Sequence, residues 1–192
     1  MKIVDCTDPR SSRLPLLLPV REIFLHHCSL STPGADNPRP IADEDLTGAN
    51  LSAEFERNSL LGTGQCRPYH VLICTDGTVD QCIRLSLRGA HALAHNVSSI
   101  AVATAGEHGL TPAQRAVLPE VLADMLLLSD GAPIRGHTAV PDATRPGHPV
   151  CPHPSTDVAA ITAEALALLT VAACYRDHAA RETAVRARGW QV

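Results

Sequence analysis

The 192-residue sequence has few aromatic side chains, no excess of basic residues and no closely spaced pair of cysteines. Phe, Trp and Tyr make up only 3% of the chain, so the core must be built mainly from Leu, Val, Ile and Ala. The formal net charge is −4, whereas nucleic-acid-binding proteins usually carry a clear basic excess, so we expect no nucleic-acid partner. The seven cysteines are scattered and form no Cys-x-x-Cys pair. Their odd number argues against a secreted disulfide framework, and we expect mostly reduced thiols.

Long apolar runs are also lacking. The longest mainly apolar stretch, residues 158–174, contains Glu164 and is shorter than the roughly 20 residues that a membrane span requires. Residues 14–19 (LPLLLP) are too short and too interrupted by proline to form the core of a signal peptide. We therefore expect no membrane span, cytoplasmic synthesis without a visible signal peptide, and a separate delivery route if the substrate lies outside the membrane.

The composition is that of a globular protein, with 45% apolar and 19% charged residues in a length that suits one domain. We predict a loose N-terminal arm, residues 1–20, and one domain, residues 21–192, that includes a C-terminal helix. Short apolar segments bounded by turn residues predict strands, and Asp76-Gly77 marks a hairpin turn between two of them. The predicted strands are residues 22–28, 69–74, 79–83 and 99–104.

Helices are predicted mainly in the second half of the chain. Thr111-Pro112-Ala113-Gln114 has the residues of a capping box with proline at the first helical position. This helix should end near residues 129–131, with Pro119 kinking or splitting it. A last, Ala-rich helix is predicted from about residue 155 toward Arg186, and a short helix within residues 41–61. Because strands mostly precede helices, we predict an α/β fold with a mixed central sheet flanked by helices.

Three residues offer side chains that bind metals. His27 ends the first predicted strand, His137 follows Gly136, and Cys151 lies beyond a Pro- and Gly-rich loop. Zinc accepts imidazole nitrogen and thiolate sulfur, and three protein ligands leave the fourth position for water, as in catalytic sites. Because these three residues are far apart in the sequence, their positions alone are weak evidence for a metal site. The alternative is a strand histidine, a loop histidine and a buried cysteine with no metal.

The order of motifs resembles the zinc amidase family that includes phage-lysozyme-type amidases and peptidoglycan recognition proteins. The resemblance spans residues 22–157 and implies a mixed sheet flanked by helices, with a zinc cleft on one side. On a strand His26 and His27 point to opposite faces, and the match to His-Cys-Ser favours His27 as the first ligand. The motifs that carry the resemblance are FLHHCS (24–29), YHVLI (69–73), DGTV (76–79), GAH (89–91) with Asn96 and Ser99-Ile100, TPAQ (111–114), Gly136-His137 and Cys151-Pro152.

The resemblance also implies roles around the metal. Tyr69 is similar to the family's catalytic tyrosine, whose hydroxyl would hydrogen-bond the zinc water or the oxyanion; the alternative is a half-buried strand tyrosine. His91 is similar to a cleft histidine that contacts substrate or steadies a ligand; the alternative is a hydrogen-bonded loop residue. Asn96 is a further candidate for substrate binding, although asparagine also suits a turn. Pro149 replaces the usual Lys or Thr two residues before the third ligand, and the adjacent His148 is our candidate for acid/base work.

The implied activity is zinc-dependent hydrolysis of the amide between N-acetylmuramic acid and L-alanine. The partner would be peptidoglycan or a muropeptide, reached after release or delivery, as by a phage lysin or antibacterial effector, or met in the cytoplasm during recycling. The alternatives are a non-catalytic peptidoglycan-binding module, an amidase for another amide, and a structural protein in which the His and Cys residues are incidental. The oligomeric state is not predicted by the sequence.

Overall fold

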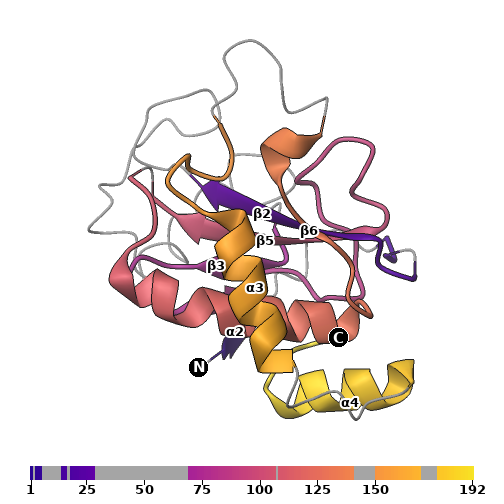
Figure 1. Cartoon of the computed structure of the whole chain (residues 1–192). Helices are drawn as coiled ribbons and strands as arrows, with labels where there is room; N and C mark the ends of the chain where they lie inside the picture. Colours follow the sequence, from indigo (N-terminus) through magenta and orange to yellow (C-terminus); the bar gives the residue numbers. More distant parts are fainter. Residues whose placement is uncertain are drawn as a thin grey trace.

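A computed structural model of the chain describes residue 1 and residues 3–5, 14–16, 18–28, 69–106, 108–140, 150–169 and 177–192. The predicted helix within residues 41–61 lies outside these ranges. The elements are arranged as a sheet with helices beside it (Figure 1). In chain order they are β1 (Ile3–Asp5), β2 (Glu22–Cys28), β3 (Val71–Ile73), β4 (Val79–Gln81), β5 (Ser99–Ala105), α2 (Pro112–Leu128), β6 (Ile134–Gly136), the 3-10 helix η2 (His137–Ala139), α3 (Val158–Leu169) and α4 (His178–Ala187).

The six strands form one mixed sheet in the order β1-β4-β3-β5-β2-β6. The β3–β4 pair is the antiparallel hairpin expected at Asp76-Gly77, and the other neighbouring pairs are parallel. The predicted α/β fold with a mixed central sheet and flanking helices is therefore confirmed. Strand β1 lies within the arm predicted to be loose, but it pairs with β4 at the edge of the sheet.

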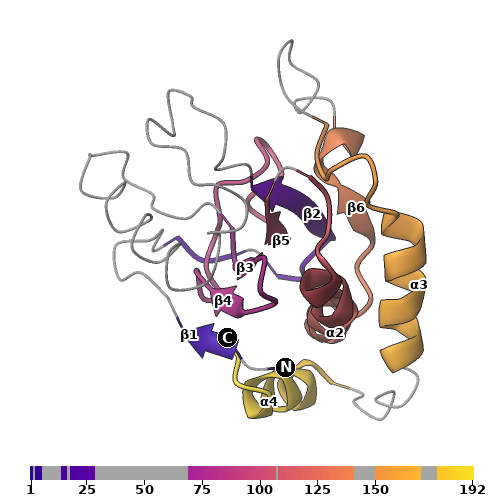
Figure 2. The ribbon, with the colours of Figure 1, turned by 90° about the vertical axis from the view of Figure 1, so that its left-hand side faces the viewer.

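One face of the sheet packs against the helices. Alternate residues of β2 and β5, such as Leu25 and Val102, join the largest apolar cluster together with Leu118, Leu122 and Met125 of α2. Helix α3 lies beside α2 and packs against both α2 and strand β6 (Figure 2). Burying this apolar surface is the main driving force for the arrangement.

The predicted capping box of α2 is present: Thr111 accepts from the backbone N–H of Gln114, whose side chain accepts from the N–H of Thr111. The prediction that Pro119 splits the helix is wrong, because α2 runs unbroken from Pro112 to Leu128. Burial of neighbouring residues such as Leu118 and Val121 outweighs the roughly 3 kcal/mol that an interior proline costs.

The predicted single C-terminal helix is two helices. Asp177 has an extended backbone and caps α4, so α4 begins anew rather than continuing α3. Beyond α4, Trp190 is buried, and its Nε1–H donates to Asp124 of α2 at 2.8 Å. Gln81 of β4 accepts from the backbone N–H of Gln191 at 2.7 Å. The C-terminal residues are thus fastened to both the helix layer and the sheet. Among the described helices, none has the length and apolar character needed to cross a membrane.

Candidate metal centre

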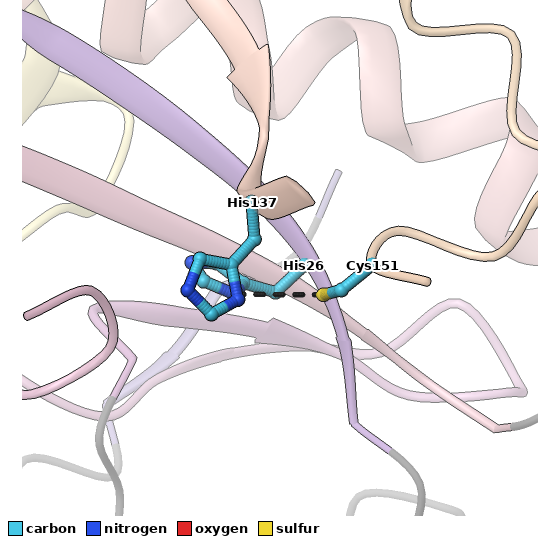
Figure 3. A group of neighbouring side chains, drawn as sticks. All are labelled: His26, His137 and Cys151. Atoms are coloured by element: carbon cyan, nitrogen blue, oxygen red, sulfur yellow. Dashed lines mark hydrogen bonds between the residues drawn. The ribbon is translucent and has the colours of Figure 1, made fainter. Parts of the chain in front are cut away.

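His26, His137 and Cys151 point toward one another (Figure 3), on the face of the sheet opposite the one that packs against α2. One donor atom from each residue lies within 4.8 Å of the others, and all three residues are buried. They come from different parts of the chain: β2, the first residue of η2, and the segment that precedes α3. In the described part of the chain, this is the one such grouping of three or more potential ligands.

The structure corrects the choice between the two adjacent histidines: His26, and not His27, joins the group. Side chains alternate along a strand, and Leu25 belongs to the helix-side core. His26 therefore points to the opposite face, whereas the ring of His27 lies 6.4 Å from that of His153. The match to His-Cys-Ser selected the wrong neighbour. His27 contributes its main chain instead, since its backbone N–H donates to Cys151 Sγ at 3.4 Å.

Small side chains on β5 make room for the imidazoles. In the parallel register, Phe24 lies beside Ala101 and His26 beside Ala103. These alanines alternate with Ile100 and Val102, which belong to the helix-side core. Strand β5 therefore presents small side chains to the candidate metal site and large side chains to the helices.

Close backbone approach brings the other two ligands into place. Strand β6 pairs with β2, and this pairing delivers His137 next to His26, with ring centroids 4.5 Å apart. A Cβ atom on Gly136 would lie 2.7 Å from Cδ of Pro152, so only glycine lets the Cys151 segment pack here. The backbone N–H and hydroxyl of Thr138 both donate to the carbonyl of Cys151, at 2.8 and 3.1 Å.

The geometry and the donor types fit zinc. Tetrahedral zinc with Zn–N of about 2.0–2.1 Å and Zn–S of about 2.3 Å sets its nitrogen and sulfur ligands about 3.6 Å apart. Cys151 Sγ lies 3.6 Å from His26 Nδ1. Burial raises the pKa of the Cys151 thiol to about 11, and the N–H of His27 acts in the opposite direction. A bound cation would displace the thiol proton and take the thiolate as its anionic ligand.

A chain of hydrogen bonds lies behind His26. Its Nε2 is 3.2 Å from Nδ1 of His91, and Nε2 of His91 is 3.3 Å from Oγ of Ser99. Burial lowers the pKa of His91 well below its ordinary value, so this ring is neutral near pH 7. Oδ1 of Asn96 accepts from the backbone N–H groups of His91 and Ala92, at 2.7 and 2.8 Å. Asn96 thus stabilises the turn that carries His91, and a ring nitrogen of His91 lies within hydrogen-bond distance of His26.

Tyr69 lies beside one of the three candidate ligands, with its ring centroid 5.1 Å from that of His26. The adjacent His70 has a different environment: its Nε2–H donates to the carbonyl of Leu87 at 2.8 Å, and its Nδ1 accepts from the N–H of Ala101. Burial lowers the pKa of His70 to about 4. Its backbone contacts give His70 a structural role. The predicted acid/base residue His148, like Pro149, lies outside the described residues.

Sequence reasoning named Ser99 only as part of a motif, gave it no role at the site, and selected His27 instead of His26. A usable signal was present in β5, where Ser99, Ala101, Ala103 and Ala105 alternate with larger residues. This alternation identifies the face with room for a site, but the register that sets His26 beside Ala103 came only from the structure.

Comparison with known proteins identifies relatives of the whole central region. A family model described as N-acetylmuramoyl-L-alanine amidase matches residues 17–154. Two curated peptidoglycan-recognition proteins, one of Drosophila simulans and one of Drosophila melanogaster, are each 33% identical over 112 residues. The alignment covers 57% of this chain and 57% of each relative, so it spans just over half the length of these proteins.

Solved structures share the fold at low identity. The N-acetylmuramoyl-L-alanine amidase LysC from Clostridium intestinale URNW has a TM-score of 0.59 at 19% identity, with 85% of this chain and 97% of that chain covered. The endolysin of the Thermus scotoductus bacteriophage Ph2119 has a TM-score of 0.59 at 15% identity, covering 85% and 99%. Drosophila peptidoglycan recognition protein SD has a TM-score of 0.59 at 17% identity, covering 80% and 89%. At these identities the likeness establishes the fold.

Proposed function

Because this chain belongs to the N-acetylmuramoyl-L-alanine amidase family, we propose that it hydrolyses the amide between N-acetylmuramic acid and L-alanine in peptidoglycan or its muropeptide fragments, with zinc as cofactor. The observation that carries the proposal is the buried group of His26, His137 and Cys151, whose donor atoms have the types and spacing of a three-residue zinc site. Three ligands leave one position open, as in catalytic rather than structural sites.

In this proposal, His26 and His137 bind as neutral imidazoles and Cys151 as a thiolate. Held by these residues, zinc would keep a net charge of +1 and would supply Lewis-acid chemistry for the scissile carbonyl and a bound water. The protein holds the ligands in place before the metal arrives: Thr138 fixes the carbonyl of Cys151, and the N–H of His27 supports the sulfur. Such pre-organisation lowers the cost of assembling the site.

Tyr69 is the proposed donor to the oxyanion that forms on the scissile carbonyl. Its ring contacts that of His26, so its position supports action at the same reacting centre. A hydroxyl that meets developing negative charge in a site of low dielectric stabilises the transition state more than the substrate. His148 is the proposed acid/base group, because the ordinary pKa of histidine suits proton transfer near neutral pH.

The second candidate function is recognition of peptidoglycan without hydrolysis. It is favoured by the curated relatives, which are described as peptidoglycan-recognition proteins. The complete set of three candidate ligands favours hydrolysis, since recognition alone does not require a cation with an open coordination position.

The test is to measure zinc content, binding of purified peptidoglycan, and release of new L-alanine amino groups from it. We expect about one zinc per chain and amine release by the wild type. His26→Ala and Cys151→Ser should lose both zinc and hydrolysis. His27→Ala is the matched control, because it removes the neighbouring imidazole from the other face of the same strand and should retain both.

Three outcomes would contradict parts of this proposal. Zinc-loaded protein that binds peptidoglycan but releases no amine would leave recognition as the function. Zinc-loaded protein that neither binds nor cleaves peptidoglycan would reject both candidate functions. Loss of zinc in His27→Ala with retention in His26→Ala would show that the ligand assignment is wrong.

A further inference from the structure

We propose that Ser99 and His91 are positioning residues that fix the tautomer of His26, so that its Nδ1 lone pair faces the metal. The inference rests on the zinc site proposed above and adds two residues to it. Neither residue is among the three candidate ligands; both act through hydrogen bonds behind His26.

Ser99 sets the donor and acceptor in each hydrogen bond of this series. Its hydroxyl has one proton, which it donates to the backbone carbonyl of His95 at 2.8 Å. The contact between Ser99 Oγ and His91 Nε2, at 3.3 Å, therefore needs its proton from the histidine. A neutral imidazole with a proton on Nε2 has its lone pair on Nδ1. His91 thus presents an acceptor toward His26.

The hydrogen bond between His91 and His26 also has a defined direction. His91 Nδ1 lies 3.2 Å from His26 Nε2, so His26 supplies the proton of this hydrogen bond. Neutral His26 then carries its lone pair on Nδ1, the atom that lies 3.6 Å from Cys151 Sγ. With the opposite tautomer, His26 would present an N–H to the cation. Two neutral histidines and one serine hydroxyl thereby prepare a metal ligand without a carboxylate.

The fold holds both positioning residues rigidly. Ser99 is fully buried at the start of β5, on the face that also carries Ala101 and Ala103. His91 is 8% exposed, and Asn96 fastens its backbone N–H at 2.7 Å. A hydrogen bond that orients a metal-binding histidine typically contributes about 10- to 100-fold to metal affinity.

The experiment reads the tautomers in the metal-free protein and then measures zinc affinity. Long-range proton–nitrogen NMR correlations distinguish protonated from unprotonated ring nitrogens, and we expect the His26 proton on Nε2. In Ser99→Ala, His91 loses its acceptor, so the proton of His26 should shift in part to Nδ1 and zinc affinity should fall about 10- to 100-fold. His70 is the internal control, because its tautomer is set by Leu87 and Ala101 and should not change.

A matched pair at position 91 separates hydrogen bonding from packing. His91→Asn retains an acceptor near Nδ1 and should keep the His26 tautomer and most of the zinc affinity, whereas His91→Leu should lose both. A metal-free wild type with the His26 proton on Nδ1 would overturn the inference. So would Ser99→Ala that folds with unchanged tautomer and zinc affinity. These measurements use no substrate, so failure of the wild type to cleave peptidoglycan would count only against the proposed hydrolysis.

Discussion

Asp124 should make the stability of this protein fall as the pH rises through about 6. Its carboxylate lies in α2, where it accepts from Trp190 Nε1–H at 2.8 Å and meets Arg188 Nε at 3.0 Å. Burial raises its pKa from an ordinary 3.8 to about 6, although Trp190 and Arg188 act in the opposite direction. The other charged groups near it are Glu120 and the amino group of Met1.

Stability falls with rising pH because folding strengthens proton binding by Asp124. The folded protein holds the proton of Asp124 more tightly than the unfolded chain does, so this stabilisation is fully present below about pH 4 and is lost as the pH rises through about 6. At about 1.4 kcal/mol per pH unit between the two pKa values, the complete loss is about 3 kcal/mol. Between pH 5 and pH 7.5 the loss is about 1 kcal/mol, because part of the transition lies below pH 5.

The assay compares wild type with Asp124→Asn, which has a nearly identical shape and no titration. Trp190 is the only tryptophan, so its fluorescence follows unfolding in urea directly. With chelator present in all samples, the free energy of unfolding of Asp124→Asn minus that of the wild type should rise by about 1 kcal/mol from pH 5 to pH 7.5. Other titrating groups are common to both proteins and cancel. If the free energies of unfolding of the two proteins change equally between pH 5 and pH 7.5, the proposed role of Asp124 is refuted.

Three other predictions concern the site and its support. Gly136→Ala should displace the Cys151 segment, since the added Cβ would meet Pro152 at 2.7 Å; zinc affinity should fall while circular dichroism stays native, and unchanged affinity would contradict the proposed close approach. Removing zinc with a chelator should lower the melting temperature, because saturation at about 100 times Kd contributes about 2.7 kcal/mol; an unchanged melting temperature in zinc-loaded and chelated protein would argue against a site in the folded state. Thr111→Ala should cost about 1 kcal/mol of unfolding free energy by removing the cap of α2, measured by urea unfolding, with Thr111→Ser as the control that restores the hydroxyl.

Local signals predicted much of the fold. Strand β2 was predicted with its observed bounds, and the start of α2 followed from Thr111 and Gln114. The choice between His26 and His27 failed because Ile23, Phe24 and Leu25 are all buried, so apolar residues occur on both faces of β2 and no alternation reveals which face carries the site. In a central strand of a mainly parallel sheet this pattern is typical.

The other incorrect predictions concern features that depend on residues far apart in the sequence. The short strand β1 could not be recognised because its pairing partner β4 lies far along the chain. Pro119 argued for a helix break, but the apolar face of α2 is buried deeply enough to outweigh it. Ser99 resembled any strand serine until the structure showed His91 beside it. Pairing register and the packing of distant segments decided these points, and neither can be read from a local pattern.

The three candidate ligands, at positions 26, 137 and 151, come from separate segments that the folded sheet brings together. A cation held there would act as a reversible cross-link between the middle of the sheet and the segment leading into α3. Closing a loop of this length removes much of the freedom of the open chain. Metal loading should therefore slow amide hydrogen exchange in β6 and around Cys151, at backbone positions that never contact the ion.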